Sequence, residues 1–84
     1  MEKRQSLLDH GFEGSLIEPA YFDEAIIGMS TDGAAVYSYD KIIEVLMREE
    51  NFSYEDAADW TSYNIIRTLP YMDVPAVIVY LIED

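Results

Sequence analysis

Carboxylic acids are concentrated in one short stretch of the chain. Five of them fall within eleven residues and no base interrupts them: Glu49, Glu50, Glu55, Asp56 and Asp59. On a helix, the span from Glu55 to Asp59 covers only ~6 Å at ~1.5 Å per residue. The three carboxylates in that span therefore come near the charge density of duplex DNA, which has about one phosphate per ~1.7 Å. Trp60 and Tyr63 offer rings for stacking one turn further along. We therefore interpret these residues as a partner-binding surface that resembles DNA in charge.

Other chemistry for the same carboxylates is weaker. Asp56 and Asp59 at i,i+3, with Glu55 beside them, could hold Mg²⁺ through waters, and two carboxylates could serve glycoside cleavage if a cleft were present. His10 is the single histidine and there is no cysteine, so neither a Ser-His-Asp nor a Cys-His set can be assembled. We expect no catalytic residue, no metal and no cofactor, and a solvated helix face is the plain alternative for the acids.

The charge balance of the whole chain is strongly acidic. Seventeen acids oppose five bases in 84 residues, a formal net charge of −12. Such a surface repels nucleic acid and anionic membranes and attracts basic grooves, although acidity also keeps small proteins soluble. No apolar run approaches the ~20 residues of a membrane span, and no signal-peptide pattern opens the chain. We expect a cytoplasmic protein without direct contact to nucleic acid or membrane.

Two helices joined by a short turn are predicted between Ser38 and Pro70. The first begins at Ser38 or Tyr39, and the second is capped by Ser53, with Asp56 three residues later as in a capping box. Pro70 stops the second helix or bends its last turn. At about 100° per residue, the predicted buried positions are Tyr39, Ile42, Ile43, Leu46 and Met47 on the first helix, and Tyr54, Ala57, Ala58, Thr61, Ile65 and Leu69 on the second.

The opposite side of the second helix mixes acids with large apolar groups. A purely solvated face needs no Trp, Tyr or Ile, and a purely buried face would not tolerate three acids. This side consists of Glu55, Asp56, Asp59, Trp60, Tyr63, Ile66 and Arg67.

The remaining segments predict a small sheet. Residues 25–29 and 34–38 are short apolar strands, and Thr31-Asp32-Gly33 between them favours a hairpin turn. A third strand is predicted over residues 76–82. The expected fold is α+β: a β-hairpin, a two-helix hairpin and a returning C-terminal strand (ββααβ), giving a three-stranded sheet with helices on one face. Residues 1–18 are expected to be a flexible leader, and residues 19–84 a single α+β domain.

The last strand is apolar at every position from Val77 to Ile82, as in a strand that is covered on both faces. It can only add at one side of the hairpin, so it forms an edge, and a long apolar edge invites association. We expect either the segment from Leu16 to Phe22 or a second copy of the protein to cover it. The possible dimer contacts are Tyr63, Ile66, Val77 and Val79.

Several strings resemble a widespread set of small, uncharacterised bacteriophage and prophage proteins. The likeness covers about Tyr21 to Tyr80, its most specific piece is Tyr37-Ser38-Tyr39-Asp40-Lys41, and it implies no established activity. The other matching strings are Ala25-Ile26-Ile27-Gly28, Asp32-Gly33, Val36, Glu55-Asp56-Ala57, Asn64, Leu69-Pro70-Tyr71 and residues 75–80. By charge and size, the chain is similar to anti-CRISPR host-defence inhibitors that occupy the DNA-binding channel of a nuclease.

Together these features favour a non-enzymatic acidic binding protein of phage type. Its expected partner is the basic surface of a nucleic-acid-binding host protein such as a CRISPR effector, which it would inhibit by presenting a DNA-mimic surface. It would act in the cytoplasm, that of the host cell if the protein is phage-encoded. The alternative is a small homodimeric interaction or scaffold module of a phage or prophage.

Overall fold

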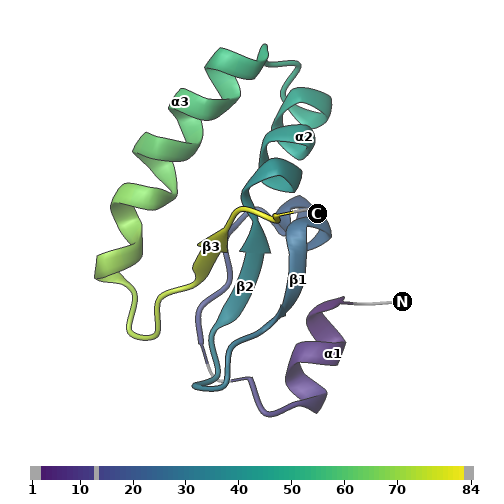
Figure 1. Ribbon diagram of the computed structural model, residues 1–84, viewed down its shortest axis with the longest axis vertical. Coiled ribbons are helices and arrows are strands. Elements are labelled where there is room, and N and C mark those ends of the chain that lie inside the picture. Colours follow the sequence, from purple (N-terminus) through teal and green to yellow (C-terminus); the bar gives the residue numbers. More distant parts are fainter. Residues whose placement is uncertain (1–2, 13, 83–84) are drawn as a thin grey trace.

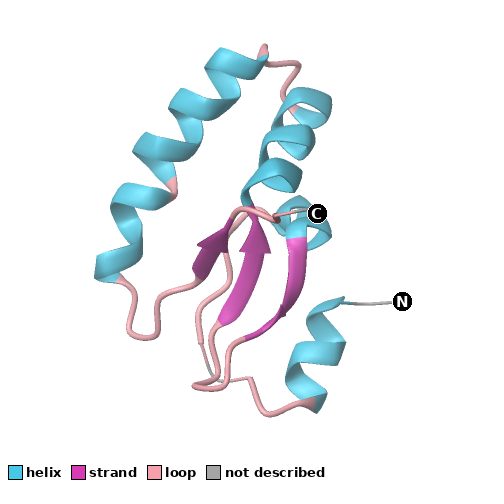
Figure 2. Cartoon of the chain, viewed as in Figure 1, coloured by secondary structure: helices cyan, strands magenta, loops and turns pink. Residues whose placement is uncertain are grey.

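The computed structural model describes residues 3–12 and 14–82. Within them the chain forms helices and a three-stranded sheet of order β1-β2-β3, in which β1 and β2 are antiparallel and β2 and β3 are parallel (Figures 1 and 2). The predicted α+β class and the ββααβ order are confirmed. The elements are α1 (Lys3–Asp9), η1 (Ala20–Ala25), β1 (Ile26–Met29), β2 (Ala35–Ser38), α2 (Tyr39–Glu49), α3 (Tyr54–Asn64), η2 (Ile66–Tyr71) and β3 (Val77–Val79), where η marks a 3-10 helix.

The hairpin between β1 and β2 turns at the predicted Asp-Gly pair. Gly33 adopts φ 93°, a backbone conformation that glycine reaches without steric cost. The Ser30 N–H donates to the carbonyl of Ala34 at 2.8 Å, so the loop holds the three residues 31–33. This closure sets the register, and Met29 consequently lies opposite Ala35.

One face of the sheet forms the floor of the core. Residues that pair across neighbouring strands share a face, so the pairs Ile26–Tyr37 and Tyr37–Ile78 place three large side chains on one side. Ile26 and Tyr37 are buried there. Side chains of η1, α2 and α3 belong to the same cluster, and they include Phe22, Ile42, Ile43, Leu46 and Ala57. Ile65, directly after α3, also belongs to it.

Helix α2 begins where the sequence predicts. The Ser38 hydroxyl accepts the Lys41 N–H, and Asp40 occupies the first turn, where the helix dipole favours a carboxylate. Ile42, Ile43 and Leu46 are buried as predicted, but Val45 takes the fourth buried position and Met47 is exposed. The helix turns a slightly different side to the core because it must also cover η1, with which it makes extensive contact.

Helix α3 is capped by Ser53, whose hydroxyl accepts the Asp56 N–H. Ala57, Thr61 and Ile65 are buried in agreement with the predicted stripe, whereas Tyr54 in the first turn is exposed. The α-helix ends at Asn64, and the chain continues as the 3-10 helix η2, which includes Pro70. Proline has no N–H to continue the α-helical ladder, so the tighter turn before it accommodates the ring.

The described part of residues 1–18 contains a helix and side chains that pack on the core. Lys3–Asp9 form α1, and Leu7 and Ile17 are buried in the core. Arg4 pairs with Asp23 through two bonds of 2.7 and 3.0 Å, and this contact raises the pKa of Arg4 further above its ordinary value. The sequence did not predict this packing, because the seven residues of α1 are too few to show a clear helical period of apolar residues.

The segment from Leu16 to Phe22 covers the sheet from the core side. The Ile17 N–H donates to the Tyr37 hydroxyl at 2.9 Å, which fixes the segment across the buried face of β2. The opposite side of β3 stays exposed, with Val77 38% accessible. Strand β3 is also shorter than the predicted 76–82, because Tyr80 leaves the ladder and its ring contacts that of Tyr39.

Helix α1 should contribute to stability through Leu7. We expect Leu7→Ala to lower the free energy of unfolding by about 2–5 kcal/mol, because it removes a buried side chain and leaves a cavity. The neighbouring Leu8 is exposed, so Leu8→Ala should change it by less than about 0.5 kcal/mol. Urea unfolding followed by circular dichroism measures both, and equal small effects would show that α1 does not pack on the core.

The buried Tyr37 phenol should make stability fall at alkaline pH. Burial raises the pKa of Tyr37 above the ordinary value of 10.0, so its contribution to stability is full below that pH and is lost as pH rises through the raised pKa. Tyr37→Phe should cost about 1–3 kcal/mol at neutral pH by leaving the Ile17 N–H without its acceptor. The difference from the parent should shrink above about pH 10. Tyr71→Phe, at an exposed phenol, is the control in the same urea titrations.

Candidate functional site

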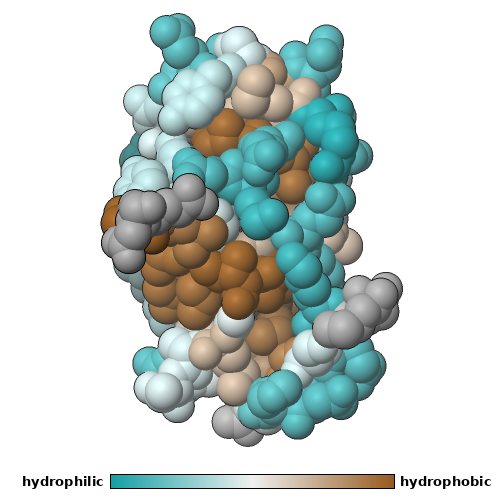
Figure 3. All heavy atoms as spheres, turned by 45° about the vertical axis from the view of Figure 1, so that its right-hand side comes forward, coloured by the Kyte–Doolittle hydropathy of each residue, from teal (hydrophilic) through white to brown (hydrophobic). Residues whose placement is uncertain are grey.

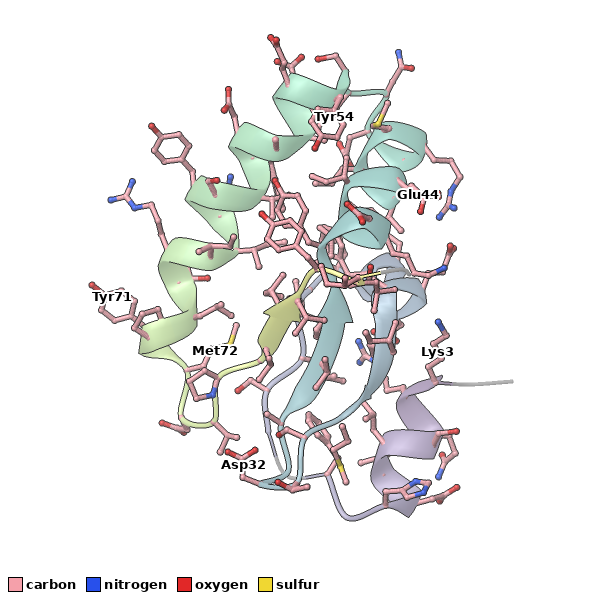
Figure 4. The ribbon with its side chains drawn as sticks, viewed as in Figure 1. Lys3, Asp32, Glu44, Tyr54, Tyr71 and Met72 are labelled. Atoms are coloured by element: carbon pink, nitrogen blue, oxygen red, sulfur yellow. The ribbon has the colours of Figure 1, made fainter. Side chains whose placement is uncertain are left out.

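The turn between α2 and α3 carries the carboxylates that the sequence singles out. We call Glu49, Glu50, Glu55, Asp56 and Asp59 the acidic end; all five are exposed. No base occurs between Arg48 and Arg67. Figure 4 shows Tyr54 at this end of the molecule, and Lys3 well below it, at the start of α1. Residues 49–59 therefore form one end of the molecule, and every formally charged side chain in this stretch is negative.

The local backbone holds the two halves of the acidic end together. The Glu50 N–H closes α2 on the Leu46 carbonyl at 2.9 Å, and Asn51 then adopts φ 57°, which ends the helix. Ser53 starts α3 two residues later. Glu55 and Asp56 occupy the first turn of α3, where the positive end of the helix dipole stabilises carboxylates.

Two members of the acidic end have partners inside the molecule. Arg48 donates to Glu49 at 3.0 Å and to both carboxylate oxygens of Glu24 at 2.7 and 3.1 Å; these bonds raise the pKa of Arg48. Glu50 accepts the Tyr21 hydroxyl at 2.9 Å. Burial, followed by this bond to Glu50, raises the pKa of Tyr21.

The other three carboxylates of the acidic end have no cationic partner in the part of the chain that the structure describes. Among the residues that the structure describes, Glu55, Asp56 and Asp59 enter no ion pair. They lie on a single turn of α3, so an approaching cation meets them together.

The two aromatic residues predicted beside the acids lie in different environments. Trp60 is half-buried, with its ring stacked on that of Phe22 at 5.8 Å between centroids. The sequence predicts Trp60 on the outer face of α3, but the residue lies at the border of the core because η1 places Phe22 against this side of the helix. Tyr63 is exposed, and the Arg67 guanidinium lies 5.4 Å from its ring centre.

The predicted dimer contacts come from three separate elements of the chain. Tyr63 is on α3 and Ile66 opens η2, and both are exposed. Val77 and Val79 are on β3, on the side of the sheet that faces away from the core. Val77 pairs with Val36, so two valines lie next to each other on the outward side of β2 and β3.

A groove that the sequence did not indicate lies between α1 and the free edge of β1. It has a volume of about 400 Å³. Its walls are Lys3, Ser6, Leu7 and His10 from α1, and residues 26–29 from β1. His10 has its Nδ1 2.8 Å from the Ser6 carbonyl. No pattern could reveal this groove, because the helix that forms one wall was itself not predicted as a packed element.

Within residues 3–12 and 14–82, no group of three His, Cys, Asp or Glu side chains lies close enough to hold a metal ion. In the same ranges, no helix has the length and apolar character needed to cross a membrane.

Comparison with known families, curated proteins and solved structures gives no match.

Trp60 and Tyr63 should differ sharply in their contribution to stability. Trp60→Ala removes the ring that covers Phe22 and should lower the free energy of unfolding by about 2–4 kcal/mol. Tyr63→Ala changes an exposed ring and should stay within about 0.5 kcal/mol. Chemical denaturation measures both changes in the free energy of unfolding. If the change for Trp60→Ala is as small as that for Tyr63→Ala, the Trp60 ring does not pack on Phe22.

Proposed function

We propose that this chain is a non-enzymatic acidic binding protein that uses its acidic end to bind the basic surface of a nucleic-acid-binding protein. The observation that carries the proposal is the row of three exposed carboxylates on the first turns of α3, Glu55, Asp56 and Asp59, without a base partner among the described residues. A cationic cleft brought against this surface gains charge pairs without first breaking internal ones.

The physical basis is competition with a polyanion. A cleft that binds DNA has cations spaced for phosphates, and the acidic end offers several negative charges within one helical turn. The formal net charge of −12 accelerates encounter with such a cleft, and added salt screens this attraction. Tyr63 is the exposed ring available for stacking, whereas Trp60 presents only the part of its ring that Phe22 leaves uncovered.

The biological setting that we propose comes from the resemblance to phage and prophage proteins. A small acidic protein of that origin would act in the host cytoplasm as an inhibitor of a defence nuclease, such as a CRISPR effector, by occupying its DNA channel. This setting rests on the strings around Tyr37-Ser38-Tyr39-Asp40-Lys41 and on charge, and it specifies a class of partner.

The test is displacement of DNA. A fluorescently labelled duplex is bound to each member of a panel of basic nucleases that includes CRISPR effectors, and fluorescence anisotropy reports its release by the chain. We expect the parent to displace DNA from at least one member. The variant Glu55→Gln, Asp56→Asn, Asp59→Asn should require at least about tenfold more protein, because three opposing charge pairs are lost.

The control removes the same charge elsewhere. Asp9, Asp32 and Asp73 are exposed and lie outside the acidic end, so Asp9→Asn, Asp32→Asn, Asp73→Asn has the same net charge as the test variant. It should displace DNA like the parent. Equal loss in both variants would attribute binding to total charge, and no displacement by the parent from any basic nuclease would refute the proposal.

A further inference from the structure

The sheet has two apolar faces, and only one is covered by the core. On β2 and β3, Val36 is paired with Val77, and Val79 follows on the same side; none of these three belongs to the core cluster. A sheet with one face in water normally alternates apolar and polar residues. Here we call Gly28, Val36, Val77 and Val79 the open face. It carries no charged side chain. Ser38, which pairs with Val79 on the same side, is buried, and its hydroxyl accepts the Lys41 N–H.

The chain beyond β3 adds a protruding apolar segment to this face. We call Tyr80–Ile82 the arm: all three side chains are exposed, and Ile82 is 87% accessible. The arm leaves β3 beside the first turn of α2, where the rings of Tyr80 and Tyr39 lie 4.9 Å apart. Figure 3 shows hydrophobic side chains gathered in one broad area on this side of the molecule. Contiguous apolar surface of this kind marks an interaction site.

The groove between α1 and β1 lies at another border of the same sheet (Figure 1). Its floor is apolar, and Ile27 beside it is 40% accessible. Its charged group is Lys3, whose ammonium donates to the carbonyls of Glu24 and Ile26 at 2.7 and 3.0 Å. An ammonium has three protons, so one remains for a further acceptor.

We infer that the open face binds a second copy of this chain, with the arm of each copy in the groove of the other. Each chain has both a protruding apolar segment and an apolar groove, and a two-fold axis lets the same two contacts form twice. Two sheets packed face to face bury such valines against each other. The inference is independent of the proposed function, because it uses none of the acidic end.

Charge favours a second copy over a foreign partner. The chain has a net charge of −12, so self-association requires a surface without acids, and the open face is such a surface. In the sequence the arm is followed by Glu83 and Asp84, and Lys3 in the groove has the complementary charge. A strongly basic partner would instead be drawn to the acidic end.

Sedimentation equilibrium from about 1 μM to about 1 mM, a range that includes weak association, tests the inference. The parent should form a dimer. Ile27→Lys and Ile82→Lys should each weaken it at least about tenfold, because a charge would be buried at the contact. Met47→Lys is the matched control, since Met47 is 40% accessible, like Ile27, but lies on α2, and it should dimerise like the parent.

Two outcomes would overturn the inference: a parent that stays monomeric over this range, or a dimer that Met47→Lys disrupts and Ile27→Lys does not. The variant at Ile82 lies outside every helix and strand, so its effect is separable from misfolding, and circular dichroism confirms the fold of each variant.

Disulfide trapping tests the arm-in-groove contact directly. The chain has no cysteine, so Ser6→Cys chains mixed with Ile82→Cys chains give a mixed disulfide only between molecules. This product should exceed the one from Ser6→Cys mixed with Tyr71→Cys under the same oxidation, because Tyr71 is as exposed as Ile82 but lies on η2. Equal yields in the two mixtures would exclude the proposed contact, whatever the oligomeric state.

Discussion

The Tyr37 phenol connects the segment before η1 to the central strand of the sheet. Its ring is buried on the core side of β2, and its hydroxyl accepts the Ile17 N–H at 2.9 Å. A backbone N–H buried in the core needs a hydrogen-bond acceptor. The Tyr37 hydroxyl is that acceptor for Ile17, so this bond fixes where Ile17 lies against β2. The segment laid down in this way leads into η1, whose Phe22 supports both α2 and Trp60. The arrangement of the helices thus depends on one phenol.

Charge and apolar surface are separated in this molecule. The acids without internal partners lie at the α2–α3 turn, while the outward side of the sheet has valines and no charge. The bases Lys3 and Arg4 lie on α1 and make contacts inside the molecule: Lys3 donates to backbone carbonyls, and Arg4 pairs with Asp23. This separation gives the chain two surfaces of different chemistry. The first is the surface proposed to bind a cationic partner, and the second is the surface inferred to bind another copy of the chain.

Local signals in the sequence predicted most elements. Ser38 and Ser53 marked the helix starts, Asp32-Gly33 marked the turn, and the apolar run after Pro75 marked an edge strand. Contacts between distant segments were beyond such signals. Trp60 has the sequence context of a surface residue and is half-buried only because Phe22 is brought beneath it. The acidic residues could be found from sequence, since charge needs no tertiary partner to be exposed, whereas the groove beside β1 needed the position of α1.

The parallel pairing of β2 with β3 has a consequence for the order of assembly. The β1–β2 hairpin and the α2–α3 pair are each local, but β3 reaches β2 only after the chain has passed through both helices and η2. Closing so long a crossover is slow relative to forming a hairpin. During synthesis, therefore, β2 has an unpaired edge until its last neighbour emerges, and the nascent chain is most exposed to mispairing in that interval.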